Sequence, residues 1–295
     1  MANIERDEVS GTETTGHEWD GIKELNTPLP NWWRWTFYAT VVWGLGYTVA
    51  YPAWPLISGA TPGVLGYSSR QEVANDIAAA AEAQAQWAER IRATSLEDIL
   101  KDEELLRFAK AGGAAAFRVN CVQCHGSGAA GFVGYPNLND NDWLWGGTVD
   151  QIHQTIANGV RYTANADTRD SQMPAFGADG VLTAEQIGDV ANYIVQLSGG
   201  QADQAAAGRG GQVFTDNCVA CHGEKAEGNK ELGAPNLADQ ITLYGGDVAA
   251  VSAQTAKPRH GVMPAWSDKL DEVKIKELAV FVHALGGGEQ AAATP

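Results

Sequence analysis

The sequence predicts an all-α protein with one N-terminal transmembrane helix followed by two tandem helical domains. Three observations lead to this fold class. An almost uncharged, aromatic-rich apolar segment occupies residues 31–55. A ten-residue pattern at 117–126 recurs at 214–223. Each copy ends in a segment with helical apolar periodicity, 184–197 and 272–285, and glycines follow both as helix stops.

The composition excludes one class of function. The chain has 295 residues, of which 44% are hydrophobic and 19% charged, as in globular proteins. Its 36 acidic and 20 basic residues give a net charge of −16. Nucleic-acid binding needs a basic face, so we expect no nucleic-acid partner, whereas a basic protein partner is compatible with this charge.

The apolar segment is long enough for a membrane anchor. A helix of about 23 residues reaches roughly 34 Å, and the hydrocarbon core of a bilayer is about 30 Å thick. Trp32 and Trp54 stand near its two ends, where amphipathic rings favour the headgroup zone, and Pro52 ends the helix. A buried core helix and a signal peptide are the alternatives. A signal peptide is disfavoured because residues 1–30 are polar and mostly acidic.

The basic residues predict the orientation of this anchor. Arg6, Lys23 and Arg34 lie at or before its start, and the next basic residue is Arg70. Basic residues stay on the cytoplasmic side of a membrane. We therefore expect a cytoplasmic segment at 1–30 and everything after the anchor across the membrane.

A linker and helical segment is predicted at 56–106. It begins with a glycine- and proline-bearing stretch and continues at 70–93 with an alanine-, glutamate- and glutamine-rich run that favours helix. Ser95, with an acid three residues later at Asp98, predicts the cap of a further short helix.

The repeat defines the two domains. Phe-Arg-Val-Asn-Cys-Val-Gln-Cys-His-Gly in the first copy matches Phe-Thr-Asp-Asn-Cys-Val-Ala-Cys-His-Gly in the second. Pro-Asn-Leu and Met-Pro-Ala-aromatic sequences also recur in register. We expect one domain at 107–200, a second at 205–288 and a tail at 289–295, because two copies make tandem domains rather than a solenoid.

Both copies contain Cys-X-X-Cys-His, the attachment signature of c-type haem. On one helical turn the two thiols face one side, where they form thioethers to the haem, and the adjacent histidine reaches the iron. Half a zinc site and a redox dithiol are the alternatives, but a zinc site uses four ligands in one fold and each copy here is self-contained. The residues concerned are Cys121, Cys124, His125, Cys218, Cys221 and His222.

A sixth iron ligand is expected from methionine. Beyond the initiator, the only methionines are Met173 and Met263, each followed by Pro-Ala-aromatic. Methionine as core filler would not be confined to the same place in both copies. Ligation by histidine and methionine raises the reduction potential and disfavours oxygen binding. His260 is a rival ligand, whereas His153 and His283 are expected at a surface or core edge.

Two prolines are candidates for orienting the proximal histidines. A ligating histidine usually donates its second N–H to an acceptor, and Pro136 and Pro235 supply carbonyls in rigid turns. Five further residues are candidates for haem propionates or the pocket wall, although ordinary packing explains them equally well: Trp143, Trp145, Arg161, Tyr162 and Tyr244.

The segment before the anchor carries a specific resemblance. Residues 17–33 (His-Glu-Trp-Asp-Gly-Ile-Lys-Glu-Leu-Asn-Thr-Pro-Leu-Pro-Asn-Trp-Trp) and 51–55 (Tyr-Pro-Ala-Trp-Pro) resemble the dihaem cytochrome c subunit, subunit III (CcoP or FixP), of cbb3-type cytochrome c oxidases. The resemblance extends over 15–288, although the haem motifs themselves are shared by many cytochromes.

This resemblance implies two class I cytochrome c domains with two covalently bound haems c. It pairs His125 with Met173 on the first iron and His222 with Met263 on the second. It also implies that the prolines orient the proximal imidazoles, and that the chain holds no catalytic residue of its own.

The resemblance also implies partners and a location. A cytochrome c or a reductase complex would donate electrons, which would pass through a monohaem subunit to a catalytic haem–copper subunit that reduces oxygen. The chain would lie in the bacterial inner membrane in contact with lipid, with the haem domains in the periplasm, where haem attachment occurs. Two other functions remain open: a membrane-tethered dihaem shuttle or dehydrogenase cytochrome, and a dihaem peroxidase, which needs one open haem site.

Overall fold

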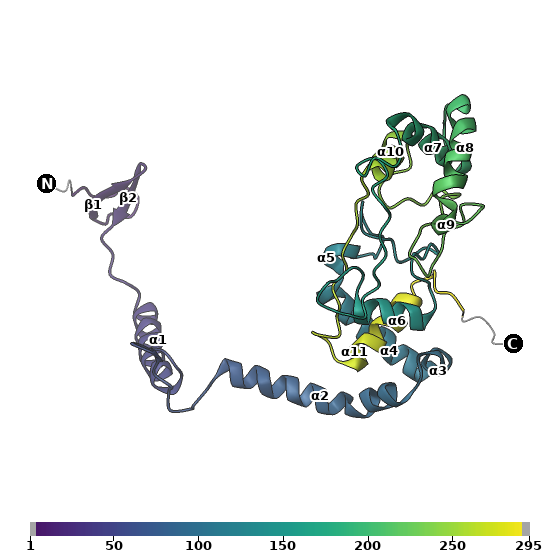
Figure 1. Cartoon of the computed structure of the whole chain (residues 1–295). Coiled ribbons are helices and arrows are strands. Elements are labelled where there is room, and N and C mark those ends of the chain that lie inside the picture. Colours follow the sequence, from purple (N-terminus) through teal and green to yellow (C-terminus); the bar gives the residue numbers. More distant parts are fainter. Residues whose placement is uncertain (1–3, 291–295) are drawn as a thin grey trace. The chain divides into compact units, whose positions relative to one another are not determined.

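The computed structural model describes residues 4–290. The chain divides into two compact units, residues 1–83 and 84–295. Helices dominate both, and small antiparallel sheets occur in the first (Figure 1). Each unit is described by itself.

Two short hairpins in the first unit depart from the predicted all-α class. β1 (Thr14–Trp19) pairs with β2 (Ile22–Leu25), and β3 (Pro55–Leu56) pairs with β4 (Gly59–Ala60). The turn between β1 and β2 is Asp20-Gly21, with φ of 51° and 81°. Asp-Gly with two positive φ values is the preferred two-residue hairpin turn, so this hairpin was present as a signal in the sequence.

α1 (Asn31–Ala50) forms where the apolar segment predicted a helix, and Tyr51 caps its end before Pro52. None of its residues is buried within the chain. Among the helices within residues 4–290, none combines the length and the apolar character that crossing a membrane requires. The predicted transmembrane anchor at 31–55 is therefore not supported. Low charge overstated the apolar character of a segment rich in tryptophan and tyrosine, whose rings carry polar groups.

The second unit is built from helices, and α2 leads into it from the first. Ser95 caps α3 as predicted, because its side chain accepts a hydrogen bond from the backbone N–H of Asp98. The helices are α2 (Ser69–Ala93), α3 (Leu96–Lys101), α4 (Glu103–Asn120), α5 (Val122–His125), α6 (Val149–Asn158), α7 (Ala184–Leu197), α8 (Gln204–Asn217), α9 (Val219–His222), α10 (Val248–Ala256) and α11 (Glu272–His283).

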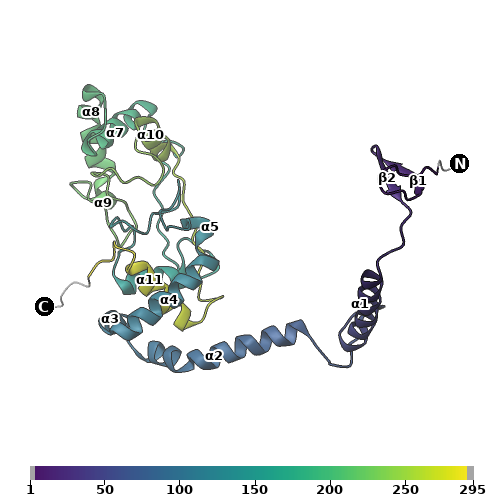
Figure 2. The same cartoon turned by 180° about the vertical axis from the view of Figure 1, so that it is seen from behind.

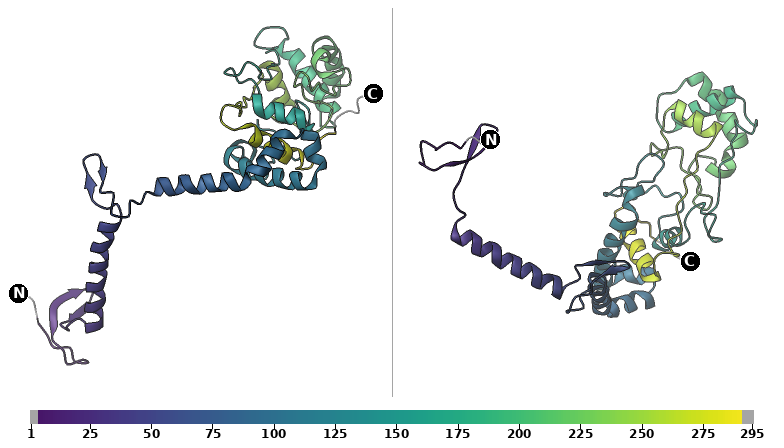
Figure 3. Two further views of the ribbon diagram at one scale, coloured as in Figure 1. Left: turned by 90° about the horizontal axis from the view of Figure 1, so that it is seen from below. Right: turned by 90° about the vertical axis from the view of Figure 1, so that its left-hand side faces the viewer.

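The two copies exchange their closing helices. α11 packs against α4 and α6 of the first copy, and α7 packs against α8 and α10 of the second. Two opposite views show α7, α8 and α10 together at one end of the unit and α3, α4 and α11 at the other (Figures 1 and 2). Two further views show the yellow α11 among the blue helices around α4 (Figure 3).

The predicted domain boundaries therefore need correction. Residues 107–200 and 205–288 do not pack as separate domains, because each range contributes its last helix to the other. Buried residues of α11, among them Leu278 and Val280, share one core with Leu105 and Phe117 of α4. Val190 of α7 shares a second core with Phe214 and Cys218.

The exchange preserves the same contact in both halves. A Cβ at Gly113 of α4 would lie 2.1 Å from the carbonyl oxygen of Glu277, and a Cβ at Gly210 of α8 would lie 2.1 Å from that of Asp189. Aromatic pairs accompany both contacts, with centroids 5.4 Å apart: Phe117 with Phe281, and Phe214 with Tyr193. Because both interfaces have the same form, the repeats alone do not reveal which closing helix belongs to which copy.

This close approach gives a matched pair of substitutions on α8. Gly210→Ala should lower the free energy of unfolding by about 1–3 kcal/mol, because the added methyl group has no room against the α7 backbone. Gly208→Ala should raise it by about 0.5–1 kcal/mol, because Gly208 is exposed with open space around it and alanine favours helix. Denaturant unfolding followed by circular dichroism measures both, and equal effects would contradict the packing of α7 on α8.

Candidate haem sites

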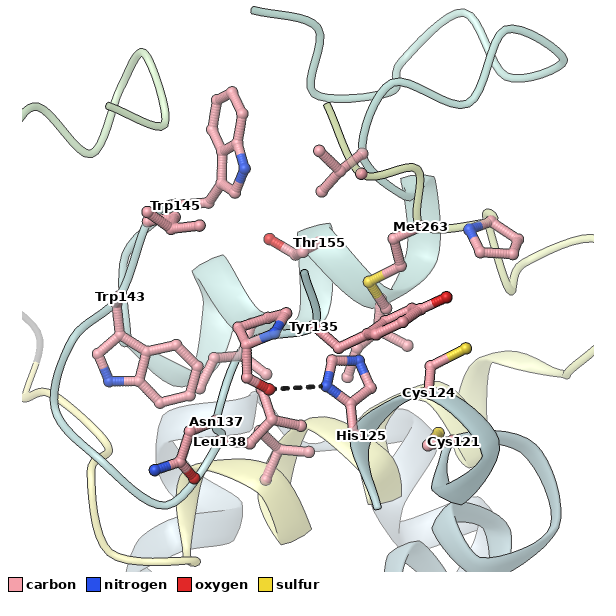
Figure 4. Close-up of a pocket in the computed structure, with 18 of the residues that line it drawn as sticks. Cys121, Cys124, His125, Tyr135, Asn137, Leu138, Trp143, Trp145, Thr155 and Met263 are labelled. Atoms are coloured by element: carbon pink, nitrogen blue, oxygen red, sulfur yellow. Dashed lines mark hydrogen bonds between the residues drawn. The ribbon is translucent and has the colours of Figure 1, made fainter. Parts of the chain in front are cut away.

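Each Cys-X-X-Cys-His motif forms a single tight turn at the end of a helix. In the first, the backbone N–H groups of Cys124 and His125 donate to the carbonyl of Cys121, at 3.1 and 2.9 Å. In the second, Cys221 and His222 make the equivalent bonds at 3.1 and 2.9 Å. The turn places both thiols and the imidazole of one motif around the same space (Figure 4).

The two more buried cysteines, Cys121 and Cys218, are not suited to thiol redox chemistry. All four are free thiols. Burial raises the pKa of Cys121 to about 11 and that of Cys218 to about 11. A reactive dithiol needs a lowered pKa so that a thiolate forms near neutral pH. The part of the chain that the structure describes also has no cluster of His, Cys, Asp and Glu side chains able to hold a metal ion by themselves, so neither alternative finds support.

The contacts predicted for the two prolines are present. Nδ1 of His125 donates to the carbonyl oxygen of Pro136 at 3.1 Å, and Nδ1 of His222 donates to that of Pro235 at 3.0 Å. Since a carbonyl only accepts, Nδ1 carries the proton and Nε2 keeps its lone pair. Burial lowers the pKa of both imidazoles, which keeps them neutral. Both rings are thus prepared to bind a metal through Nε2.

A tight turn after each histidine brings the proline back to it. The N–H of Gly131 donates to the carbonyl of His125, and the N–H of Gly228 donates to that of His222. Gly131 has φ of 68° and Gly228 has φ of 82°. A Cβ at Gly131 would lie 2.3 Å from the carbonyl oxygen of Tyr135, so the close return of the chain requires glycine there.

A cavity lies beside the first motif. Cys121, Cys124 and His125 form one wall, and Met263 faces them from the opposite side with its sulfur directed toward the imidazole (Figure 4). Most of the remaining lining is apolar and includes Phe117, Leu138, Trp143, Ile152, Ile156, Leu278 and Val282. The cavity thus combines two thiols, a neutral imidazole and a thioether within apolar walls.

The methionine in this cavity is not the one that the sequence predicted. His125 was paired with Met173, but Met173 does not line the cavity, whereas Met263 does. Backbone hydrogen bonds fix this arrangement: Val160 N–H donates to Met263 O at 2.9 Å, and Met263 N–H donates to Val160 O at 3.0 Å. Trp266 N–H also donates to Ile156 O at the end of α6. The exchange of closing helices carries Met263 across with α11.

The second half shows the reciprocal arrangement. The segment after Met173 docks on the end of α10, because the N–H groups of Gly177 and Ala178 donate to the carbonyl of Ala256, at 3.2 and 3.0 Å. This is the counterpart of the docking of Trp266 on α6. The segment after Met173 therefore lies in the half that contains His222, and the structure brings Met263 to the cavity of His125 rather than to His222.

The other candidates divide between wall and packing. Trp143, Trp145 and Arg161 line the first cavity, whereas Tyr162 and Tyr244 are not among its lining residues. Sequence reasoning missed the contribution of α6 through Ile152, Thr155 and Ile156. Their helical spacing was a readable signal, because residues at i, i+3 and i+4 share one face of a helix.

Three of the other histidines have separate roles. His260, the rival ligand, accepts a hydrogen bond from the backbone N–H of Met173 at 3.1 Å through Nε2. His283 contacts the carbonyl of Glu289 at 2.9 Å through Nε2. His153 is partly buried on α6, as expected for a core edge, and its Nε2 has no hydrogen-bond partner among the described residues. None of the three lines the first cavity.

The donor set fits haem c. Two thiols at one rim match the two vinyl groups of a haem, and an imidazole and a thioether on opposite walls match the two axial positions of its iron. The apolar lining matches the macrocycle.

Residues 108–194 and 205–282 match the family described as "Cytochrome C oxidase, cbb3-type, subunit III", and residues 11–58 match the "N-terminal domain of cytochrome oxidase-cbb3, FixP". The chain belongs to the family of cbb3-type cytochrome c oxidase subunit III. This confirms the family that residues 17–33 and the haem motifs predicted.

Similar proteins match this chain over nearly its whole length. The cbb3-type cytochrome c oxidase subunit FixP of Sinorhizobium medicae is 57% identical over 283 residues, 96% of this chain and 97% of that protein. The subunit CcoP of Cereibacter sphaeroides is 54% identical, covering 94% and 95%. The subunit CcoP of Azospirillum brasilense is 50% identical, covering 98% and 100%.

A carboxyl group on the wall of the first cavity gives a prediction of pH dependence. Burial, followed by the nearby Asp239 and Asp140, raises the pKa of Asp142 to about 6. Asp142 is neutral below that pH and negative above it, and a negative charge favours ferric over ferrous haem. With haem bound, we expect the midpoint potential at the first motif to fall as the pH rises through about 6, and redox titration measures this.

Two substitutions test the assignment. Asp142→Asn should flatten the pH dependence in this window, whereas substitution of the exposed Asp179 by asparagine should leave it unchanged. A potential that keeps its pH dependence in Asp142→Asn would assign the effect to another group.

The raised pKa of Asp142 also affects the stability of the fold. Its contribution to the free energy of unfolding is fully present below its unfolded pKa of about 3.9 and is lost as the pH rises through the folded value.

Proposed function

We propose that the chain is the electron-transfer subunit of a cbb3-type oxidase and carries two covalently bound haems c. Cys121 and Cys124 would hold the first, with His125 and Met263 as the ligands of its iron. Cys218 and Cys221 would hold the second, with His222 and Met173 as the ligands of its iron. The arrangement that carries this proposal is the apolar cavity in which Met263 faces His125 across from both thiols (Figure 4).

Bound haem supplies one-electron redox chemistry, and the protein sets its conditions. The Nδ1–H bonds to Pro136 and Pro235 fix the tautomer and the orientation of the proximal imidazoles. Ligation by a thioether favours the ferrous state and occupies the position that oxygen would need. Apolar residues such as Ile152 and Leu278 exclude water from the cavity. These features suit a site that exchanges electrons without binding a substrate.

The partners follow from the family. We propose that electrons arrive from a cytochrome c or a reductase complex and leave through a monohaem subunit to a catalytic haem–copper subunit. The chain has six histidines in all, and the three outside the haem motifs and the loop of His260 are too few and too dispersed for a copper site. Oxygen reduction is therefore assigned to a partner.

We propose that the protein works at the bacterial inner membrane, with its haem unit in the periplasm. Covalent haem attachment takes place on the non-cytoplasmic side. α1 supports membrane association, because it exposes large apolar and aromatic side chains all round, among them Trp35 and Trp43 at 73% and 71%. Such rings favour the membrane interface and the surfaces of partner helices.

Two docked methionine loops argue against the rival peroxidase function. A peroxidase needs one haem with an open or displaceable position. Here Trp266 is bonded to the end of α6, and the two residues directly after Phe176 are bonded to the end of α10. A membrane-tethered shuttle would keep the same haem sites, but the match of residues 11–58 to the oxidase family favours the oxidase subunit.

The axial pairing is tested in chains that retain one haem. In a Cys218→Ala/Cys221→Ala chain, haem is attached only at Cys121 and Cys124. We expect Met263→His to abolish the weak far-red absorption band that a methionine sulfur gives to ferric haem, because Met263 is its ligand. Met173→His in the same chain should leave the band unchanged.

The reciprocal chain supplies the control. With Cys121→Ala/Cys124→Ala, the remaining haem should lose the band in Met173→His and keep it in Met263→His. The opposite pattern in both chains would restore the pairing within each sequence copy and contradict the exchange of closing helices.

A further inference from the structure

Arg161 lies between the two methionine loops and binds both. Its Nε donates to the carbonyl of Gly261 at 2.8 Å, and its Nη1 donates to the carbonyl of Ser171 at 3.0 Å. Gly261 stands two residues before Met263, and Ser171 stands two residues before Met173. One guanidinium thus binds both loops, and in each loop it binds the residue two positions before the methionine.

The backbone around Arg161 is fixed from both sides. Arg161 has φ of 52°, a left-handed conformation that is uncommon for a residue with a side chain. Its N–H donates to the carbonyl of Arg169 at 2.8 Å, and the preceding Val160 exchanges two hydrogen bonds with Met263. A strained backbone persists where its surroundings determine it and where it places a side chain that the site needs. Here the left-handed backbone of Arg161 directs the guanidinium between the two methionine loops, where it binds Gly261 and Ser171.

His260 makes a second link of the same kind. It lies on the loop that leads to Met263, yet its Nε2 accepts the backbone N–H of Met173 at 3.1 Å. A backbone N–H only donates, so the unprotonated Nε2 is the acceptor. The loop of one methionine therefore also fixes the main chain of the other at the ligand residue itself.

We propose that Arg161 is a positioning residue shared by both haem sites: its guanidinium fastens the loop before Met263 to the loop before Met173, with His260 as the second link. The inference rests on the proposed function, in which these methionines are the sulfur ligands. One side chain then determines how firmly both thioethers are held over their haems. The two sites lose sulfur ligation together when the link is removed.

A simpler role for Arg161 gives a different result. The residue also lines the cavity of His125, where its positive charge could serve a propionate of the first haem alone. A residue serving one haem changes at most one of the two sites. The shared role requires that both sites change. A loss of more than half of the sulfur–iron band therefore distinguishes the two roles.

The experiment uses the full-length chain with both haems attached. In Arg161→Gln, with haem content per chain unchanged, we expect the far-red sulfur–iron band of the ferric protein to lose more than half of its wild-type amplitude. Both midpoint potentials should also shift to lower values, because loss of the thioether favours ferric haem. Retention of half of the amplitude or more would overturn the proposal.

Arg169 provides the matched control. It is a partly buried arginine of the same loop, but its guanidinium binds Thr155 and Gln154 of α6 and stacks on Trp145, with no bond to either methionine loop. Arg169→Gln should therefore keep more than half of the band. A loss in Arg169→Gln equal to that in Arg161→Gln would show general loosening of the fold and would equally overturn the proposal.

His260 keeps the proposal testable if Arg161→Gln does not accumulate. In a Met263→His chain the band comes from Met173 alone, and His260→Leu should weaken it because the acceptor for the Met173 N–H is lost. In a Met173→His chain the same substitution should leave the band of Met263 in place. An unweakened band in the first chain contradicts the link, whereas a wild-type protein without any such band contradicts the proposed function instead.

Discussion

The two reciprocal hydrogen bonds between Val160 and Met263 join the end of α6 to the segment that leads into α11. Gly159 allows this approach, since it has φ of 74° and a Cβ there would lie 2.4 Å from the carbonyl of Met263. Once this contact forms, α11 closes the first half, and α7 is left to close the second. Each half therefore contains one helix from the other sequence copy.

Two buried carboxylates stand at equivalent places beside the helix-packing glycines, and the two halves treat them differently. Asp189 of α7 is bonded by the guanidinium of Arg209 on α8, at 2.8 and 2.5 Å. Glu277 of α11 pairs with Lys274 of its own helix at 2.7 Å, and burial raises its pKa. A charge-assisted bond therefore joins α7 to α8, whereas α11 and α4 rely on apolar packing. Lys276 adds a different link, because its ammonium donates to carbonyls at the end of α2.

Local chemistry was readable from the sequence, and the pairing of distant segments was not. The turn of Cys121 to His125, the carbonyl of Pro136 and the cap at Ser95 are determined by neighbours in the chain, and all three were predicted correctly. The resemblance to the oxidase subunit paired His125 with Met173 of its own sequence copy, whereas Met263 lines the cavity of His125. Because the two helix interfaces are nearly identical, the sequence allows each closing helix to pack on its own copy or on the other. Only the path of the loops decides between these two arrangements.

The path of the loops affects how the two proposed haem sites are held relative to each other. Two separate domains joined by a flexible linker would vary the distance between their haems, and the rate of electron transfer falls steeply with distance. In this unit α7 packs on α8 directly after a short connection, and the loops at Arg161 and His260 are bonded to one another. The two proposed haem sites are therefore joined by bonded loops as well as by the chain, so their separation does not depend on a flexible linker alone. The exchange of closing helices links the two halves of the duplicated sequence. Both halves still use the same kind of helix interface, α7 on α8 and α11 on α4.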